Sequence, residues 1–160
     1  MASPESPEPS STDPPSDCII PGGTKLLTNM PDLFMIPELV FGALVWILVA
    51  SINVADKVSQ GWVIFVSLLL FVLTLLLLIC YFFGYPRNST AWCLLDACYH
   101  GVAALFYFSA AVLQANSTVR LQGLNNKVYQ IDVAATIFAF AATVLYVAHA
   151  LFSFKRWKSV

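Results

Sequence analysis

The sequence predicts an all-α membrane protein in which four transmembrane helices form an antiparallel bundle. Hydrophobic residues make up 59% of the chain and charged residues 11%, whereas about a quarter of a soluble domain is charged. Four apolar runs each approach the ~20 residues that cross a bilayer. They cover residues 33–55, 62–83, 92–115 and 133–154. The connection at 56–61 has about six residues, so the first two helices are expected to form an antiparallel hairpin.

Residues 1–29 have the composition of a disordered tail, because six prolines stand among serine, threonine and acidic residues. This stretch lacks the basic start and apolar core of a signal peptide, so the first transmembrane helix is expected to direct insertion. The sequence therefore predicts a disordered cytoplasmic tail at 1–29, a four-helix membrane domain at 30–155 and a short basic cytoplasmic tail at 156–160.

The distribution of Lys and Arg predicts that both termini are cytoplasmic. Four spans place the two ends and the connection after the second helix on one side of the membrane. Cytoplasmic flanks carry an excess of basic residues. The terminal side has five basic residues and the other side three: Lys25, Arg87, Lys155, Arg156 and Lys158 against Lys57, Arg120 and Lys127.

The helix at 92–115 is expected to turn one polar face inward. Steps of three and four residues keep side chains on one side of an α-helix, and they join Cys93, Asp96, His100, Ala103, Tyr107, Ala110 and Gln114. An acid and a histidine that face lipid cost a few kcal/mol or more, so this face should meet other helices.

The helix at 133–154 follows the same pattern, which begins one residue earlier at Asp132. Its inward face is predicted to contain Asp132, Ala135, Ala139, Ala142, Tyr146, His149 and Ser153. Small residues on such faces let helix backbones approach closely. The helix at 62–83 differs, because it is apolar almost all round, and it is expected to be the helix least covered by protein.

Counting residues from the helix ends predicts one buried polar cluster. Asp96 and His149 lie four to five residues inside the terminal side of their helices, at a similar depth of about 6 to 8 Å. Glu38 enters at that depth from the first helix, and His100 lies one turn deeper than Asp96. We therefore expect these four residues to form an inward cluster that fixes the register of the helices.

The pattern does not point to a catalytic, cofactor or metal site. Asp96 and His100 can orient one another, but no nucleophile has a defined place beside them. The spacing of Cys, His and Asp is unlike that of a zinc site, and the basic residues do not cluster as they do in nucleic-acid-binding proteins. An alternative function keeps the same residues: a small oligomeric channel or proton-coupled carrier that uses Glu38, Asp96, His100 and His149.

The cysteines allow two interpretations. Cys93 and Cys98 suit small packing positions, since free cysteine behaves as a buried hydrophobe. Palmitoylation of Cys80 or Cys93 is the functional alternative, because both lie toward the predicted cytoplasmic face. Under this topology no cysteine lies in an outer loop, so an extracellular disulfide framework is not expected.

Several motifs in order resemble the myelin and lymphocyte protein family of MARVEL-domain proteolipids. They are the segments 41–51 (FGALVWILVAS), 60–67 (QGWVIFVS), 95–100 (LDACYH), 104–114 (ALFYFSAAVLQ) and 156–159 (RWKS). The resemblance covers about residues 31–159. The proline-rich tail and the predicted outer loop at 116–131 lie outside it.

The resemblance implies a tetraspan protein of the plasma membrane, apical or myelin-like, and of trafficking vesicles. It implies association with cholesterol- and sphingolipid-rich membrane and a role in vesicle trafficking, apical sorting or myelin-type membrane organisation, with no enzymatic activity. Expected partners are these lipids, further copies of the chain or other membrane proteins. The terminal residues Arg156, Trp157, Lys158 and Ser159 would be tied to sorting, although a basic flank with an interfacial tryptophan fits the same residues equally well.

Overall fold

The structure, a computed structural model, describes residues 18–52, 56–85, 89–123 and 125–159. Its four long helices confirm the predicted fold class: α1 Met35–Ser51, α2 Lys57–Phe82, α3 Thr90–Leu121 and α4 Asn126–Lys158. Each is long and apolar enough to cross a membrane, the first span beginning at Asp32. Two short 3-10 helices, η1 Gly23–Leu27 and η2 Asp32–Phe34, precede α1.

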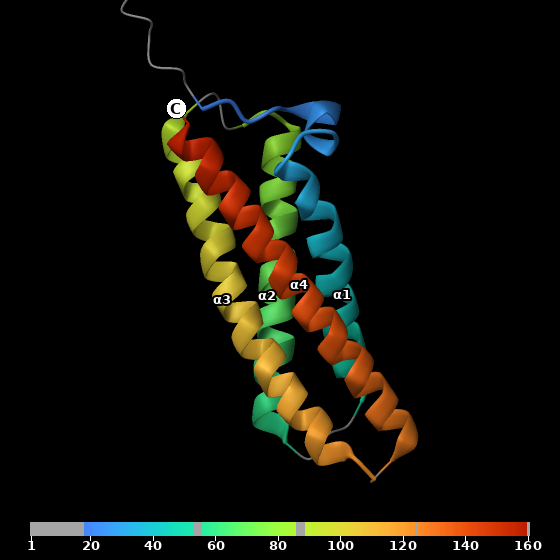
Figure 1. Ribbon diagram of the computed structural model, residues 1–160. Coiled ribbons are helices and arrows are strands. Elements are labelled where there is room, and N and C mark those ends of the chain that lie inside the picture. Colours follow the sequence, from blue (N-terminus) through green and yellow to red (C-terminus); the bar gives the residue numbers. More distant parts are fainter. Residues whose placement is uncertain (1–17, 53–55, 86–88, 124, 160) are drawn as a thin grey trace, which may run out of the picture.

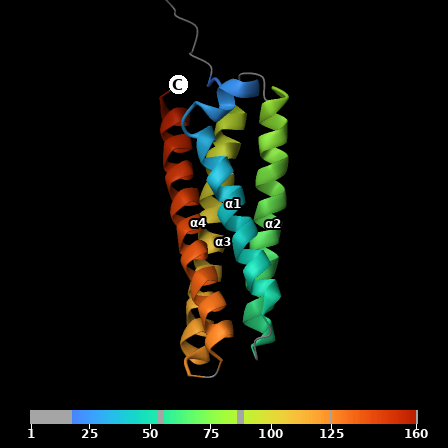
Figure 2. The ribbon, with the colours of Figure 1, turned by 90° about the vertical axis from the view of Figure 1, so that its right-hand side faces the viewer.

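The helices run alternately up and down, and both described ends of the chain lie at the same end of the bundle (Figure 1). Around the bundle each helix packs against the next, and α4 closes the ring against α1. Consequently α2 and α4 lie on opposite sides, as Figure 2 shows. We call the end that carries the chain termini the terminal end and the opposite one the hairpin end.

The inward faces of α3 and α4 are the ones that the residue spacing predicts. All seven side chains of the α3 face are buried, and so are all seven of the α4 face. Between them the core is built largely from alanine, including Ala103, Ala110, Ala139 and Ala142. Because these side chains are small, the two helices pack over most of their length.

Helix α2 packs against α1 and α3, and the other helices do not enclose it (Figure 2). It is nevertheless no less covered than α1, because 28% of the membrane window of each is buried. The expectation that the second helix is the least covered is therefore confirmed in part, because α2 shares the lowest coverage with α1. Helices α3 and α4 are covered slightly more, at 33% each, because they pack against one another over most of their length.

Three predicted boundaries also need correction. Residues 1–17 of the tail predicted to be disordered lie outside the described part of the chain. Residues 18–29 are ordered, because they pack on the terminal end through Ile20 and the fully buried Leu26. These apolar side chains find a surface on Tyr81 and Cys93. At the other end, the predicted loop 116–131 is mostly helical, since α3 continues to Leu121 and α4 starts at Asn126.

A tight connection joins α3 to α4. Gly123 has a φ of 80°, a backbone conformation that favours glycine. The Asn125 side chain then caps α4 by accepting hydrogen bonds from two backbone amides of its first turn. The third correction concerns the C-terminal tail predicted at 156–160, because α4 runs on to Lys158.

Candidate functional site

The four ionisable side chains that the sequence groups together meet inside the terminal end. Helix α1 supplies Glu38, α3 supplies Asp96 and His100, and α4 supplies His149. All four are fully buried, each with 0% of its surface exposed. Glu38 reaches this place from the first turn of α1, where the preceding proline is tolerated because its missing amide would have no helical partner.

The two imidazole rings are stacked, and each ring lies between the same two carboxylates. Their centroids are 3.5 Å apart and their planes differ by 24°. Toward Glu38, His149 Nδ1 lies 3.0 Å from Oε1 and His100 Nε2 lies 3.6 Å from Oε2. Toward Asp96, His100 Nδ1 lies 3.3 Å from Oδ1 and His149 Nε2 lies 3.9 Å from Oδ2.

Three further side chains, which the predicted four-residue cluster does not include, hold Asp96 in place. The Tyr81 hydroxyl donates to Oδ1 at 2.9 Å, and the Ser153 hydroxyl donates to Oδ2 at 2.5 Å. The Arg156 guanidinium donates to the same Oδ2 at 3.0 Å. Asp96 thus connects α2, α3 and α4.

Arg156 extends the site to the N-terminal segment. Its Nη1 lies 3.0 and 2.9 Å from the two carboxylate oxygens of Asp32, which is 1% exposed. We use the name His–carboxylate cluster for this set of six side chains: Asp32, Glu38, Asp96, His100, His149 and Arg156. The cluster contains three carboxylates and one guanidinium, so full ionisation of these groups leaves two excess negative charges that must be balanced nearby.

The predicted sorting tail is divided by this arrangement. The Arg156 side chain is only 14% exposed because it pairs with two acids, and Trp157 is half-buried against the packed N-terminal segment. Lys158 and Ser159 are exposed. The structure therefore leaves two of the four residues at the surface.

A second polar group, which the sequence did not indicate as a site, lies near the hairpin end. Asp132 is fully buried and accepts from the Gln114 amide at 2.7 Å and from the Thr118 hydroxyl at 2.5 Å. Thr118 also lies 2.8 Å from the hydroxyl of Thr136. We call these four residues the Asp132 cluster. The described side chains that surround Asp132 in this cluster are all uncharged.

Several buried hydroxyl groups lie between the two clusters. Thr74 of α2 lies 2.8 Å from the Tyr99 hydroxyl and 2.7 Å from the Tyr146 hydroxyl, which links α2 across the bundle to α4. The ring of Tyr146 stacks on Tyr107, whose hydroxyl is buried without a hydrogen-bond partner. That hydroxyl faces Gly42, where a Cβ atom would lie 2.9 Å away.

The cysteines depart from both interpretations of the sequence. Cys93 forms a disulfide with Cys18, so in this state its sulfur cannot carry a palmitoyl group, and the bond ties the N-terminal segment to α3. Cys80 is a half-buried free thiol and Cys98 is exposed. Of the two predicted palmitoylation positions, only Cys80 retains a free sulfur.

Comparison with known proteins assigns the family. Residues 27–152 match the model of the MARVEL family, described as a membrane-associating domain. The chain is 50% identical over 141 residues to the human myelin and lymphocyte protein, which covers 88% of this chain and 92% of the relative. The chain belongs to the myelin and lymphocyte protein family of MARVEL proteins. It is thus a multi-pass membrane protein of a proteolipid family that is not a known enzyme family.

Other relatives agree with this assignment. The bovine myelin and lymphocyte protein is 49% identical over the same shares of both chains. The mouse CKLF-like MARVEL transmembrane domain-containing protein 8 is 35% identical over 137 residues, or 84% of this chain and 78% of the relative. No solved structure matches the chain significantly. The region matched to the family includes Asp32, Glu38 and His149 but ends before Arg156.

Proposed function

We propose that the protein organises cholesterol- and sphingolipid-rich membrane and acts in vesicle trafficking, apical sorting or myelin-type membrane assembly. This proposal rests on the division of side chains between the outside of the bundle, which is apolar, and the inside, which holds the acidic groups. Large apolar side chains are exposed on all four helices, for example Val40, Leu76, Leu105 and Val144. Acidic groups of the spans are turned inward and paired, so the surface offered to the surroundings is one that lipid tails cover.

The alternative of a channel or proton-coupled carrier has less support. A conducting path requires polar or water-filled surface across the whole membrane. Between the two buried polar clusters the core is packed mainly with apolar side chains, including the fully buried Val45, Ala103 and Ala139. The Thr74 hydroxyl there is hydrogen-bonded to two tyrosine hydroxyls. This packing favours a scaffold that works through its surface.

An apolar groove supports lipids as partners. It has a volume of about 270 Å³ and lies between α2 and α3. Leu76, Leu95 and Trp92 are among its lining residues, and the free thiol of Cys80 is another. A tryptophan beside an apolar groove suits a position near the membrane interface. We propose that a sterol or an acyl chain, including one attached to Cys80, lies in this groove.

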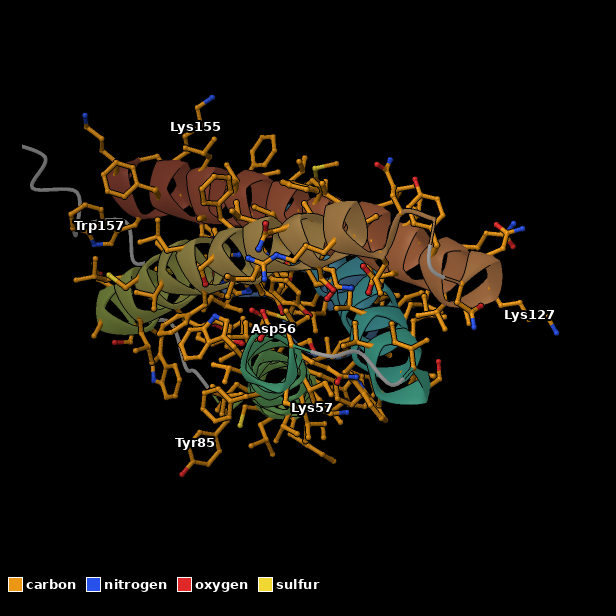
Figure 3. The ribbon with its side chains drawn as sticks, turned by 90° about the horizontal axis from the view of Figure 1, so that it is seen from below. Asp56, Lys57, Tyr85, Lys127, Lys155 and Trp157 are labelled. Carbon is orange, nitrogen blue, oxygen red and sulfur yellow. A yellow bond between two sulfur atoms is a disulfide. The ribbon has the colours of Figure 1, made fainter. Side chains whose placement is uncertain are left out.

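Both termini are proposed to be cytoplasmic, in the plasma membrane and in trafficking vesicles. Lys155 and Lys158 are exposed at the terminal end, and Figure 3 shows Lys155 pointing away from the bundle. Basic side chains near an anionic cytoplasmic leaflet contribute about 1 kcal/mol each to membrane attachment. Lys127 marks the opposite end of the bundle in the same view.

The proposal is tested by phase partitioning. The full chain, labelled with a fluorophore, is reconstituted in giant vesicles of sphingomyelin, cholesterol and an unsaturated phosphatidylcholine. Enrichment in the ordered phase is expected. Leu95→Trp, which fills the groove, should reduce it, whereas Leu105→Trp, on the exposed outer face of α3, should not. Enrichment of the wild-type chain in the disordered phase would reject the proposed function.

A matched pair of lysines tests the sorting role of the tail. Lys155 and Lys158 are both exposed on the last turns of α4. If they serve only as a basic membrane anchor, replacing either lysine with alanine should weaken membrane attachment equally. If Lys158 and Ser159 are read as a signal, Lys158→Ala should redirect the protein in polarised cells and Lys155→Ala should not. If the two variants have the same distribution in the cell, the sorting signal is rejected and the tail acts only as a basic anchor.

A further inference from the structure

Three buried polar atoms without a hydrogen-bond partner belong to one place in the molecule. They are Glu38 Oε2, His100 Nε2 and His149 Nε2, and their side chains are fully buried. We propose that Glu38, His100 and His149 bind one divalent transition-metal ion of the zinc type. The spacing of these residues in the sequence gives no sign of a metal site, because the three ligands come from three different helices.

The separations of the ligand atoms fit such an ion. Each of the three residues offers one ligand atom, and these atoms lie within 4.8 Å of one another. The 3.6 Å between His100 Nε2 and Glu38 Oε2 is too long for a hydrogen bond. It is close to the separation of about 3.4 Å between two ligands of a tetrahedral zinc ion with bonds of about 2.1 Å.

The hydrogen bonding of His100 leaves its other nitrogen free for a cation. His100 Nδ1 lies 2.9 Å from the backbone carbonyl oxygen of Asp96, which can only accept, so Nδ1 carries the proton. In the neutral ring the lone pair is then on Nε2, facing the Glu38 carboxylate. Two electron pairs that face each other require a cation between them. A histidine that donates one N–H to a carbonyl and binds metal with the other nitrogen is the usual arrangement in metal sites.

His149 also lies between Glu38 and Asp96, but its ring is reversed, so the nitrogen on the Glu38 side is Nδ1. Its Nδ1 lies 3.0 Å from Glu38 Oε1, while its Nε2 faces Asp96 Oδ2 at 3.9 Å. Asp96 therefore stands behind both histidines, held by Tyr81 and Ser153. Because the two ring planes differ by only 24°, binding requires the rings to tilt apart so that both nitrogens point at the ion.

The charge of the site also calls for a divalent cation. The ionised His–carboxylate cluster has two excess negative charges in a buried place, and one divalent ion with two neutral histidines balances them. Two protons on the histidines would give the same balance. The experiment must therefore distinguish a bound metal ion from protons.

The chain offers a clean readout because it contains two histidines, and both are in this cluster. The full chain without a polyhistidine tag is purified in detergent, treated with a chelator and titrated with Co²⁺ and then Zn²⁺. We expect one ion per chain, the visible absorption of tetrahedral Co²⁺ and its loss when Zn²⁺ is added. X-ray absorption at the zinc edge should show two imidazole ligands and no sulfur.

Variants connect the signal to named residues. His100→Gln and His149→Gln should abolish stoichiometric binding, and Asp96→Asn should weaken it by about 10- to 100-fold, as is usual when a group behind a metal ligand is lost. Asp132→Asn, a buried carboxylate in the other cluster, is the control and should bind normally. The metal stoichiometry and the spectra of the wild-type chain test the proposal even if a variant fails to fold. Binding well below one ion per chain, sulfur ligation, or unchanged binding in a folded His100→Gln variant would each overturn the proposal.

Discussion

The His–carboxylate cluster and the Asp132 cluster bury acids on the same pair of helix faces but stabilise them differently. At the terminal end, acids meet a guanidinium and two imidazoles, and the contacts join all four helices and η2. At the hairpin end, Asp132 accepts hydrogen bonds from an amide and a hydroxyl, and these two bonds join α3 to α4. The first cluster therefore organises the whole bundle, whereas the second fixes one helix pair.

The largest effect is expected from Asp96→Leu. This change leaves Arg156, Tyr81 and the histidines without their shared acceptor, and removal of one partner from a buried ion pair costs about 3–5 kcal/mol. We expect loss of the monodisperse protein in detergent and retention in the endoplasmic reticulum. Asp96→Asn should be milder because it keeps one acceptor oxygen. A normally folded Asp96→Leu protein would show that the cluster does not organise the bundle.

The section between the clusters should respond to a single methyl group. Gly42→Ala places a Cβ atom 2.9 Å from the Tyr107 hydroxyl, and such overpacking costs about 1–3 kcal/mol. Tyr107→Phe removes a buried hydroxyl without a partner, so it should be neutral or stabilising and should rescue Gly42→Ala. Thermal unfolding of the two single variants and the double variant in one detergent measures the coupling. Additive changes would contradict the predicted contact.

A smaller effect is expected from Asp132→Asn, which compares the two clusters directly with Asp96→Asn. The amide keeps the acceptor for Gln114 and loses one hydrogen bond from Thr118, at a cost of about 1 kcal/mol. Asp96→Asn also removes a charge that faces Arg156. The unfolding temperature should therefore fall less for Asp132→Asn. An equal fall would mean that both acids depend on their charge to the same degree.

The smallest effect is expected at Asp56, a partly exposed helix cap outside both clusters. Its carboxylate accepts from the Ser59 hydroxyl at 2.8 Å and from the Ser59 amide at 3.2 Å, and these hydrogen bonds lower its pKa from the ordinary 3.8. Since the folded pKa is the lower one, the cap contributes fully above pH 3.8 and is lost as the pH falls through the folded value. The NMR shift of the Ser59 amide in micelles should follow this titration. Asp56→Ala should abolish the pH response without moving the signals of the cluster histidines.

The helix faces were predictable from the sequence because the periodicity of a helix determines which side chains lie inside. Counting residues from the helix ends also put Asp96 and His149 at one depth, and the structure brings them within 3.9 Å. The sequence predicts a tail at Arg156 because the apolar run of the fourth span ends at Phe154. Its spacing contained the missing signal, since His149, Ser153 and Arg156 continue one helix face in steps of four and three.

Other parts of the site had no local signal. Asp32 lies in a short 3-10 turn, where no long periodic pattern indicates which way a side chain points. Cys18 and Cys93 are 75 residues apart, and nothing in the sequence around them indicates their bond. Asp132 and Gln114 were each predicted to face inward, but Thr118, which completes their cluster, lay in a segment expected to be a loop.

The hairpin end has a mechanical consequence for whatever approaches the membrane there. Six residues of each helix, 116–121 and 126–131, continue past the apolar runs, which at ~1.5 Å per residue makes a post about 9 Å tall. The buried Asp132 lies just beneath it and ties its two halves together. A molecule or a second membrane that touches this end meets a surface of defined height and orientation. Residues 116–121 and 126–131 are already helical, so the entropic cost of a contact with them is low.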